Sequence, residues 1–340
     1  MFEPLQLPRS LPAALRDVSN PKTWVRRSVL RDLVRHAEGE RRDEVLRALE
    51  QRAIDDPIVN LRADALLALA DSAATESLDV ILRGADDNEP RVRQMAVVAL
   101  GELAPAGHAV ASSIIRQALV STEAAMRYQA LIAARRVVPA ELAKALETAL
   151  SDEDLELRYL ALRLLDESDF EQISESEKVT IAGRALNDEG HKVRVAAALI
   201  LGRAGDSRAE AHLAGAIGGR DLEHDDVSAA ISLCGAQGYK SAREALMKRA
   251  HTGFRLVPDP HGLDARVALA KLGDAGVISG ILGDLSAWTR HARNMAVMAA
   301  GSAALAAAEG PLERMRNQPR RADPELVEEA LASLKSAGTS

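Results

Sequence analysis

An arginine recurs along the chain in one local setting, directly after an apolar residue and ahead of small or aliphatic residues three and seven positions later. We call it the marker arginine. The copies are Arg26, Arg62, Arg93, Arg127, Arg158, Arg194, Arg266 and Arg293, with Ser228 in a degenerate copy. Asn20, Asp56, Asp87, Ser121, Asp152 and Asp188 stand six residues before the first six. Such cations could bind phosphates or pair with acids, and a buried cation needs a partner. The periodic acid favours a structural ladder, formed by Asp56, Arg62, Asp87, Arg93, Asp152, Arg158, Asp188 and Arg194.

Other side chains near the marker arginines are candidates for binding a partner. Tyr128 and Tyr159 each directly follow a marker arginine, so they occupy equivalent positions in adjacent repeats. They are binding anchors if this position faces solvent and core residues if it faces the neighbouring helix. The basic residues Arg27, Arg31, Arg135 and Arg163 either bind a partner or belong to a solvated face. We take these six residues, with Phe254, as the candidate partner-binding set.

Catalytic and metal-binding patterns are weak. The run from Glu223 to Asp226, with His251 and His261, offers oxygen and imidazole donors, but no pair has the i, i+4 spacing of a helical zinc site. Acids at the start of a helix are the simpler interpretation. Cys234 lies among apolar residues and is predicted to be a buried, inert thiol. We therefore expect no catalytic residues, no metal and no cofactor.

Two helices per repeat are needed to position these residues. Offsets of three and seven fall on one helical face, so each marker arginine opens an amphipathic helix. A second apolar-periodic segment precedes each of these helices, and breakers such as Asp55-Asp56-Pro57 separate the two. Ser174 and Glu177 form a capping-box pattern. The marker positions, with Ser228 counted among them, recur at intervals of 27 to 38 residues. No segment alternates with a period of two. The sequence thus predicts helical hairpins that stack into an all-α, right-handed α-solenoid of about nine to ten hairpins.

With the Asp–Arg spacing and the apolar pattern established, the chain resembles the HEAT-repeat family, and most closely the short bacterial, phycobilin-lyase-like type. The resemblance extends from about Pro21 to Leu334. It implies a scaffold whose second helices line a concave groove. We expect an N-terminal cap segment at 1–20, the solenoid at 21–321, and a C-terminal capping helix and tail at 322–340. The pattern breaks over residues 220–262, which are either a binding patch or a structural irregularity.

Composition limits the function further. The net charge is −7 and aromatic residues make up 2% of the chain, which makes nucleic acid an improbable partner. A single cysteine excludes an intrachain disulfide, and no apolar run is long enough for a membrane span. We predict a cytoplasmic, bacterial, non-enzymatic scaffold or adaptor that binds a protein on its concave face. The alternatives are a nucleic-acid-binding groove like that of DNA-repair glycosylases, and a lyase-like or lyase-accessory protein.

Overall fold

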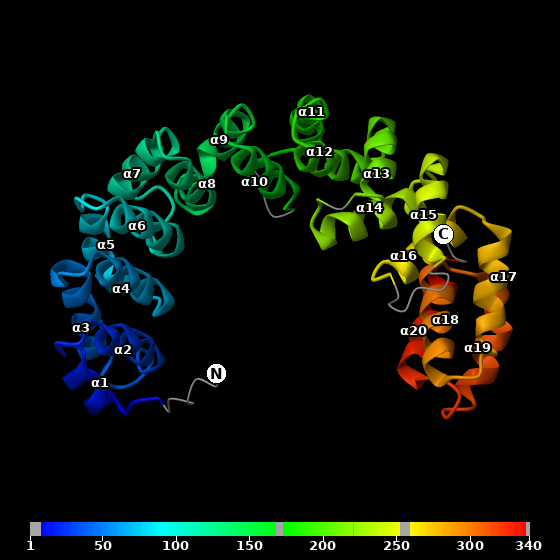
Figure 1. Cartoon of the computed structure of the whole chain (residues 1–340), viewed down its shortest axis with the longest axis horizontal. Coiled ribbons are helices and arrows are strands. Elements are labelled where there is room, and N and C mark those ends of the chain that lie inside the picture. The colour runs from blue at the N-terminus through cyan, green and yellow to red at the C-terminus, as the bar shows by residue number, and fades with distance from the viewer. Residues whose placement is uncertain (1–7, 168–172, 220, 252–258, 338–340) are drawn as a thin grey trace. The chain divides into compact units, whose positions relative to one another are not determined.

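The computed structural model describes residues 8–167, 173–219, 221–251 and 259–337, and all regular structure in those ranges is helical. Helices follow one another as antiparallel hairpins, which form an α-solenoid (Figure 1). We call the second helix of each hairpin its marker helix, because this helix carries the marker arginine in all hairpins except those ending in α14 and α20. The fold class predicted from the repeat is therefore confirmed.

The chain divides into two compact units, Met1–Ile173 and Ser174–Ser340. The hairpins of unit 1 are α1 (Leu11–Asp17) with α2 (Thr23–Arg35), α3 (Arg42–Asp55) with α4 (Val59–Asp71), α5 (Leu78–Gly84) with α6 (Pro90–Leu103), α7 (Ala109–Leu119) with α8 (Ala124–Val137), and α9 (Leu142–Ala149) with α10 (Leu155–Asp166). Within unit 1, each marker helix packs against the marker helix of the next hairpin. In Figure 1 the marker helices of unit 1 lie along one side, and α3, α5, α7 and α9 lie along the other.

Unit 2 repeats this arrangement. Its hairpins are α11 (Glu175–Ala185) with α12 (His191–Arg203), α13 (Glu210–Ala216) with α14 (His224–Ala236), α15 (Arg243–Ala250) with α16 (Gly262–Lys271), α17 (Ala275–Asp284) with α18 (Arg290–Ser302), and α19 (Glu309–Arg316) with α20 (Pro324–Ala337). Short 3-10 turns precede five of the first helices, at Thr75–Ser77, Pro139–Glu141, Ser207–Ala209, Lys240–Ala242 and Ala306–Ala308. The predicted capping box is present at the start of α11, where Ser174 and Glu177 bond to each other's backbone amides.

The core of each unit consists mainly of alanine and aliphatic side chains packed between the helices. Three and seven residues after Arg62 lie Ala65 and Leu69, both completely buried, and the equivalent residues Ala96 and Leu100 are also completely buried. These offsets lie on one face of a helix. Small residues on that face allow close helix packing, and the aliphatic side chains fill the space between hairpins. The apolar periodicity therefore marks the face through which hairpins stack.

Glycines occur in marker helices where two backbones approach most closely. A Cβ atom on Gly301 would lie 2.7 Å from the Cα atom of Ala330 in α20. Gly101 occupies the same offset from its marker arginine, and its Cβ would lie 2.9 Å from the Cα atom of Ala133 in α8. Neither position admits a side chain without movement of backbone, so these glycines set the spacing between neighbouring hairpins.

The terminal helices pack as members of hairpins. The helix α1, in the segment predicted as an N-terminal cap, packs on α2, and α20 packs on both α18 and α19. None of the helices described here is long and apolar enough to cross a membrane.

Candidate functional site

In unit 1, marker arginines pair with turn aspartates, and each pair joins one hairpin to a later turn. In three such pairs, Nε and Nη2 of the arginine each bind one carboxylate oxygen. Arg26 lies 2.8 and 3.0 Å from the two oxygens of Asp56. The corresponding distances are 2.9 and 3.0 Å from Arg62 to Asp87, and 2.7 and 2.7 Å from Arg127 to Asp152. This parallel two-bond geometry is the strongest form of the arginine–carboxylate interaction. We call the series of arginines and turns the ladder.

The residue six positions before a marker arginine, usually an aspartate, is bound through its backbone carbonyl by that same arginine. Arg62 Nη1 donates to the carbonyl oxygen of Asp56 at 3.0 Å, and Arg93 Nη1 donates to that of Asp87 at 2.9 Å. The corresponding bonds are Arg127 to Ser121 at 2.9 Å, Arg158 to Asp152 at 2.9 Å, and Arg194 to Asp188 at 2.6 Å. A ladder turn is thus held by two arginines, one on its carbonyl and one on its carboxylate.

Burial of these pairs removes their charges from water, so each charge depends on its partner. The Arg26 side chain is 9% exposed and that of Asp56 is fully buried. Burial alone would raise the pKa of Asp56, but hydrogen bonds from Arg26 and from the amide of Ile58 outweigh it and lower that pKa. The hydrogen bond from Arg62 lowers the pKa of Asp87, and that from Arg127 lowers the pKa of Asp152. The carboxylates are therefore held in the charged form that the ladder requires.

The ladder changes chemistry in unit 2. Ser228 stands where a marker arginine is expected, and its hydroxyl lies 3.1 Å from Nδ1 of the buried His261. His224 stacks on His261 with ring centroids 4.2 Å apart. Burial, with the nearby Arg249, lowers the pKa of His261. A neutral Ser–His hydrogen bond thus takes the place of a salt bridge, in the region where the sequence pattern breaks.

On the exposed side of the marker helices, two of the four basic candidates are paired with acids. Arg27 Nε lies 2.9 Å from Asp64 of the next marker helix, and Arg135 forms an ion pair with Glu167. Arg31 is exposed on α2 and Arg163 is exposed on α10. We call the exposed side chains of α2, α4, α6, α8 and α10 the marker-helix face. The arginines on this face belong to a surface of mixed charge.

The two tyrosines are half-buried, between the two alternatives that the sequence left open. Tyr128 lines an open hollow of about 420 Å³ with Gln94, Gln129 and Glu156, so its ring is accessible from the surface. Tyr159 occupies the equivalent position in α10. Phe254, the remaining candidate, lies outside the described residues.

The apolar residues of this face that the sequence analysis missed include Trp24 and Ile132. Trp24 on α2 is 61% exposed and Ile132 on α8 is 41% exposed. The available signal was the offset from the marker arginine. Ile132 lies five residues after Arg127, as Arg31 does after Arg26, and Trp24 lies two residues before Arg26. The face therefore offers apolar and aromatic contacts among its charges.

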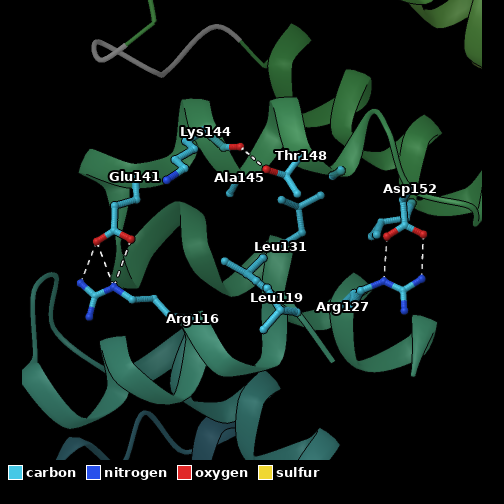
Figure 2. Close-up of a pocket in the computed structure, with 12 residues that line it drawn as sticks. Arg116, Leu119, Arg127, Leu131, Glu141, Lys144, Ala145, Thr148 and Asp152 are labelled. Carbon is cyan, nitrogen blue, oxygen red and sulfur yellow. Dashed lines mark hydrogen bonds and ion pairs between the residues drawn. The ribbon is translucent and has the colours of Figure 1, made fainter. Parts of the chain in front are cut away.

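A second hollow, of about 160 Å³, lies between α7, α8 and α9 (Figure 2). Ion pairs of Arg116 with Glu141 and of Arg127 with Asp152 lie at its two ends, and Leu119 and Leu131 line it between them. The charged groups at its ends thus bind one another. A ligand site needs polar groups that converge on the ligand, so this hollow contributes packing around a ladder pair.

The remaining candidates for catalysis or metal binding are either buried or not grouped with other ligand residues. Cys234 is completely buried, and burial raises the pKa of its thiol to about 12. Across the described ranges, no three His, Cys, Asp or Glu side chains are grouped so that they could hold a metal ion. Asp226, in the acidic run at the start of α14, is buried, and His251 bonds to the Met247 carbonyl.

Comparison with known proteins supports the architecture. Residues 46–136 match the family model described as HEAT repeats. The Escherichia coli protein YibA, in a crystal structure, has 15% sequence identity and a TM-score of 0.55, over 78% of this chain and 93% of that one. An engineered protein (16% identity, TM-score 0.45, 95% and 98% covered) and human deoxyhypusine hydroxylase with glycerol (19%, 0.34, 77% and 95%) also align. No curated protein matches in sequence. Residues 46–136 thus match HEAT repeats, and the chain is an α-solenoid of helical hairpins.

Proposed function

We propose that this protein is a scaffold that binds a partner protein on the marker-helix face of unit 1. The candidate contacts are the aromatic and apolar side chains Trp24, Tyr128, Tyr159 and Ile132, together with Arg27, Arg31, Arg135 and Arg163. In this proposal the protein positions its partner and has no catalytic role.

The pairing of surface arginines with acids is the observation that carries the proposal. A nucleic-acid groove needs cations that are available to phosphates, and its affinity comes largely from displacing counterions from the phosphate backbone. Arg27 is bonded to Asp64, and Arg135 is paired with Glu167. Each acid would repel a phosphate at the position where its arginine would attract one. A protein surface presents both signs of charge, and therefore fits this face better.

Exposed apolar side chains strengthen the choice of a protein partner. Trp24 and Ile132 are exposed, and the ring of Tyr128 lines an open hollow beside Gln94 and Gln129. Tryptophan and tyrosine are enriched among the residues that dominate binding energy at protein interfaces, particularly where an anchor enters a pocket. The packed hairpins fix the backbone that carries these side chains. Little ordering is then needed on binding, which favours affinity.

The experiment is affinity capture from a lysate of the source cells, with and without nuclease, using the full chain and two variants. The test variant replaces both Tyr128 and Ile132 by alanine. The control replaces Val110, which is 53% exposed on α7, by alanine. We expect a near-stoichiometric protein to be captured by the wild type and by Val110→Ala after nuclease, and to be lost with the double variant. Equal capture by all three proteins, or capture that disappears with nuclease, would overturn the proposal.

A further inference from the structure

One turn of unit 1 keeps the ladder conformation without its carboxylate. Among the turns that precede α4, α6, α8 and α10, the ladder position holds Asp56, Asp87, Ser121 and Asp152 in that order. Among these four turns, Ser121 is the one residue without a carboxylate.

Two hydrogen bonds show that the Ser121 turn has the same conformation as its neighbours. The Ser121 hydroxyl accepts a bond from the amide of Glu123 at 3.2 Å, as Asp87 Oδ1 accepts one from the amide of Glu89 at 2.9 Å. The Ser121 carbonyl accepts a bond from Arg127 at 2.9 Å, as the Asp87 carbonyl accepts one from Arg93 at 2.9 Å. By this equivalence the short Ser121 side chain points where an aspartate would reach the preceding hairpin.

The arginine of that preceding hairpin uses one of its three guanidinium nitrogens. Arg93 Nη1 donates to the carbonyl oxygens of Asp87 and Asn88, at 2.9 and 3.0 Å. In the described part of the chain, its Nε and Nη2 atoms make no hydrogen bond or ion pair. In Arg62 and Arg127 the same two nitrogens bind both oxygens of an aspartate, at 2.7 to 3.0 Å.

We propose that Arg93 and Ser121 form a binding site for a carboxylate, which completes the ladder from outside the chain. The carboxylate would accept bonds from Arg93 Nε and Nη2 in the geometry of the intact pairs, with the Ser121 hydroxyl beside it. By the repeat, Arg93 corresponds to Arg62, which binds the aspartate of the next turn, and its charge has no carboxylate partner in the described residues. A carboxylate at this turn would supply that partner. Ser121 is half-buried in a turn whose next residues, Thr122 and Glu123, are exposed, which leaves access for a side chain.

The source of the carboxylate is an aspartate or glutamate of the bound partner, and this assignment rests on the proposed function. The existence of the site does not, because acetate alone can occupy it. A phosphate would use the same two nitrogens, so acetate and phosphate are separate arms of the test.

The test is an NMR titration of the full chain with sodium acetate at constant ionic strength, following the side-chain Nε–H signals of the arginines. The variants are Arg93→Gln, which identifies the Arg93 signal by its loss, and Ser121→Asp, which supplies the carboxylate from within the chain. We expect a saturable shift of the Arg93 signal in the wild type, already present without acetate in Ser121→Asp and no longer responsive there. The signal of Arg26, which pairs with Asp56, serves as the control and should not move; in the variants, its unchanged position shows that the fold is intact.

The dependence of the Arg93 signal on acetate distinguishes a binding site from its absence. Saturation by acetate that Ser121→Asp abolishes supports the site. A shift that is linear in acetate, or equal in the wild type and Ser121→Asp, overturns it. Saturation by inorganic phosphate at concentrations tenfold lower than acetate overturns the carboxylate assignment. Failure of the proposed function appears elsewhere, as a lack of protein capture while the acetate response remains.

Discussion

Removing the charge of Asp56 is the sharpest perturbation of the ladder. Replacement by asparagine keeps the size of the side chain and one oxygen, which can still accept the bond from the amide of Ile58 at 3.0 Å. It removes the charge that faces Arg26, and both side chains of that pair are at least 90% buried. Removing one partner of a buried pair leaves an uncompensated charge and costs about 3–5 kcal/mol. We expect the variant to lose stability in this range.

An exposed pair supplies the matched control. Arg27 and Asp64 join the marker helices α2 and α4 at 2.9 Å, but their side chains are 65% and 24% exposed. Ion pairs of this kind contribute about 0–1 kcal/mol. Asp64→Asn should therefore leave the stability of unit 1 nearly unchanged.

The assay is hydrogen exchange measured by mass spectrometry on peptides from α2 and α4. Repeat arrays open locally, so a local opening free energy is better defined than one global value. A double-mutant cycle with Arg26→Met isolates the interaction between the two side chains. We expect Arg26→Met to recover part of the loss caused by Asp56→Asn. Additive effects, or a loss below about 1 kcal/mol, would refute the claim that the buried pair supports the stacking.

Four further outcomes are expected. Gly301→Ala should cost about 1–3 kcal/mol in urea unfolding because the new methyl group meets backbone 2.7 Å away. Gly283→Ala, which has no atom within 4 Å of the added methyl group, should be neutral or gain up to ~1 kcal/mol; equal effects would contradict the packing argument. Because the pKa of His261 is lowered from 6.5, the unfolded chain binds its proton first, so stability should fall as pH drops from 6.5 through the lower folded value. In thermal unfolding, the melting temperature of His261→Gln should depend less on pH over that window. An unchanged pH dependence would exclude His261 as its source. The Cys234 thiol, with its pKa raised to about 12, should react with iodoacetamide only as fast as unit 2 opens. The alkylated fraction, measured by mass spectrometry on samples quenched at intervals, gives this rate. Ser121→Asp should raise the local opening free energy, measured by hydrogen exchange on peptides of α6 and α8, by ~0.5–1 kcal/mol. A lower opening free energy would contradict the claim that Ser121 stands where a ladder aspartate would bind Arg93.

The helical hairpins could be predicted because their signals are local and periodic. Ala65 and Leu69 lie at fixed offsets from Arg62, and Ser174 with Glu177 marks a helix start without any tertiary information. The division into units after Ile173 could not be predicted, since the marker spacing from Arg158 to Arg194 is ordinary. That boundary depends on which helices pack, which the repeat does not encode.

The register of the ladder also depended on three-dimensional structure. Asp56 and Arg62 lie six residues apart, which left open a pair within one repeat or between neighbouring repeats. In the structure the Asp56 carboxylate binds Arg26, 30 residues before it. The spacing shows that an acid and a cation recur, but only hairpin stacking decides which acid meets which cation. Similarly, the apolar character of Trp24 and Ile132 gave no reason to place them at the surface, and only their offsets from the marker arginines pointed to it.

The most direct test of the scaffold proposal is a hydrogen-exchange footprint of the full chain with its captured partner bound. The account predicts slower exchange in peptides of α8 and α10, which carry Tyr128 and Tyr159, and no change in α7 and α9 of the same hairpins. Protection confined to α7 and α9, or no protection in unit 1, would contradict binding on the marker-helix face.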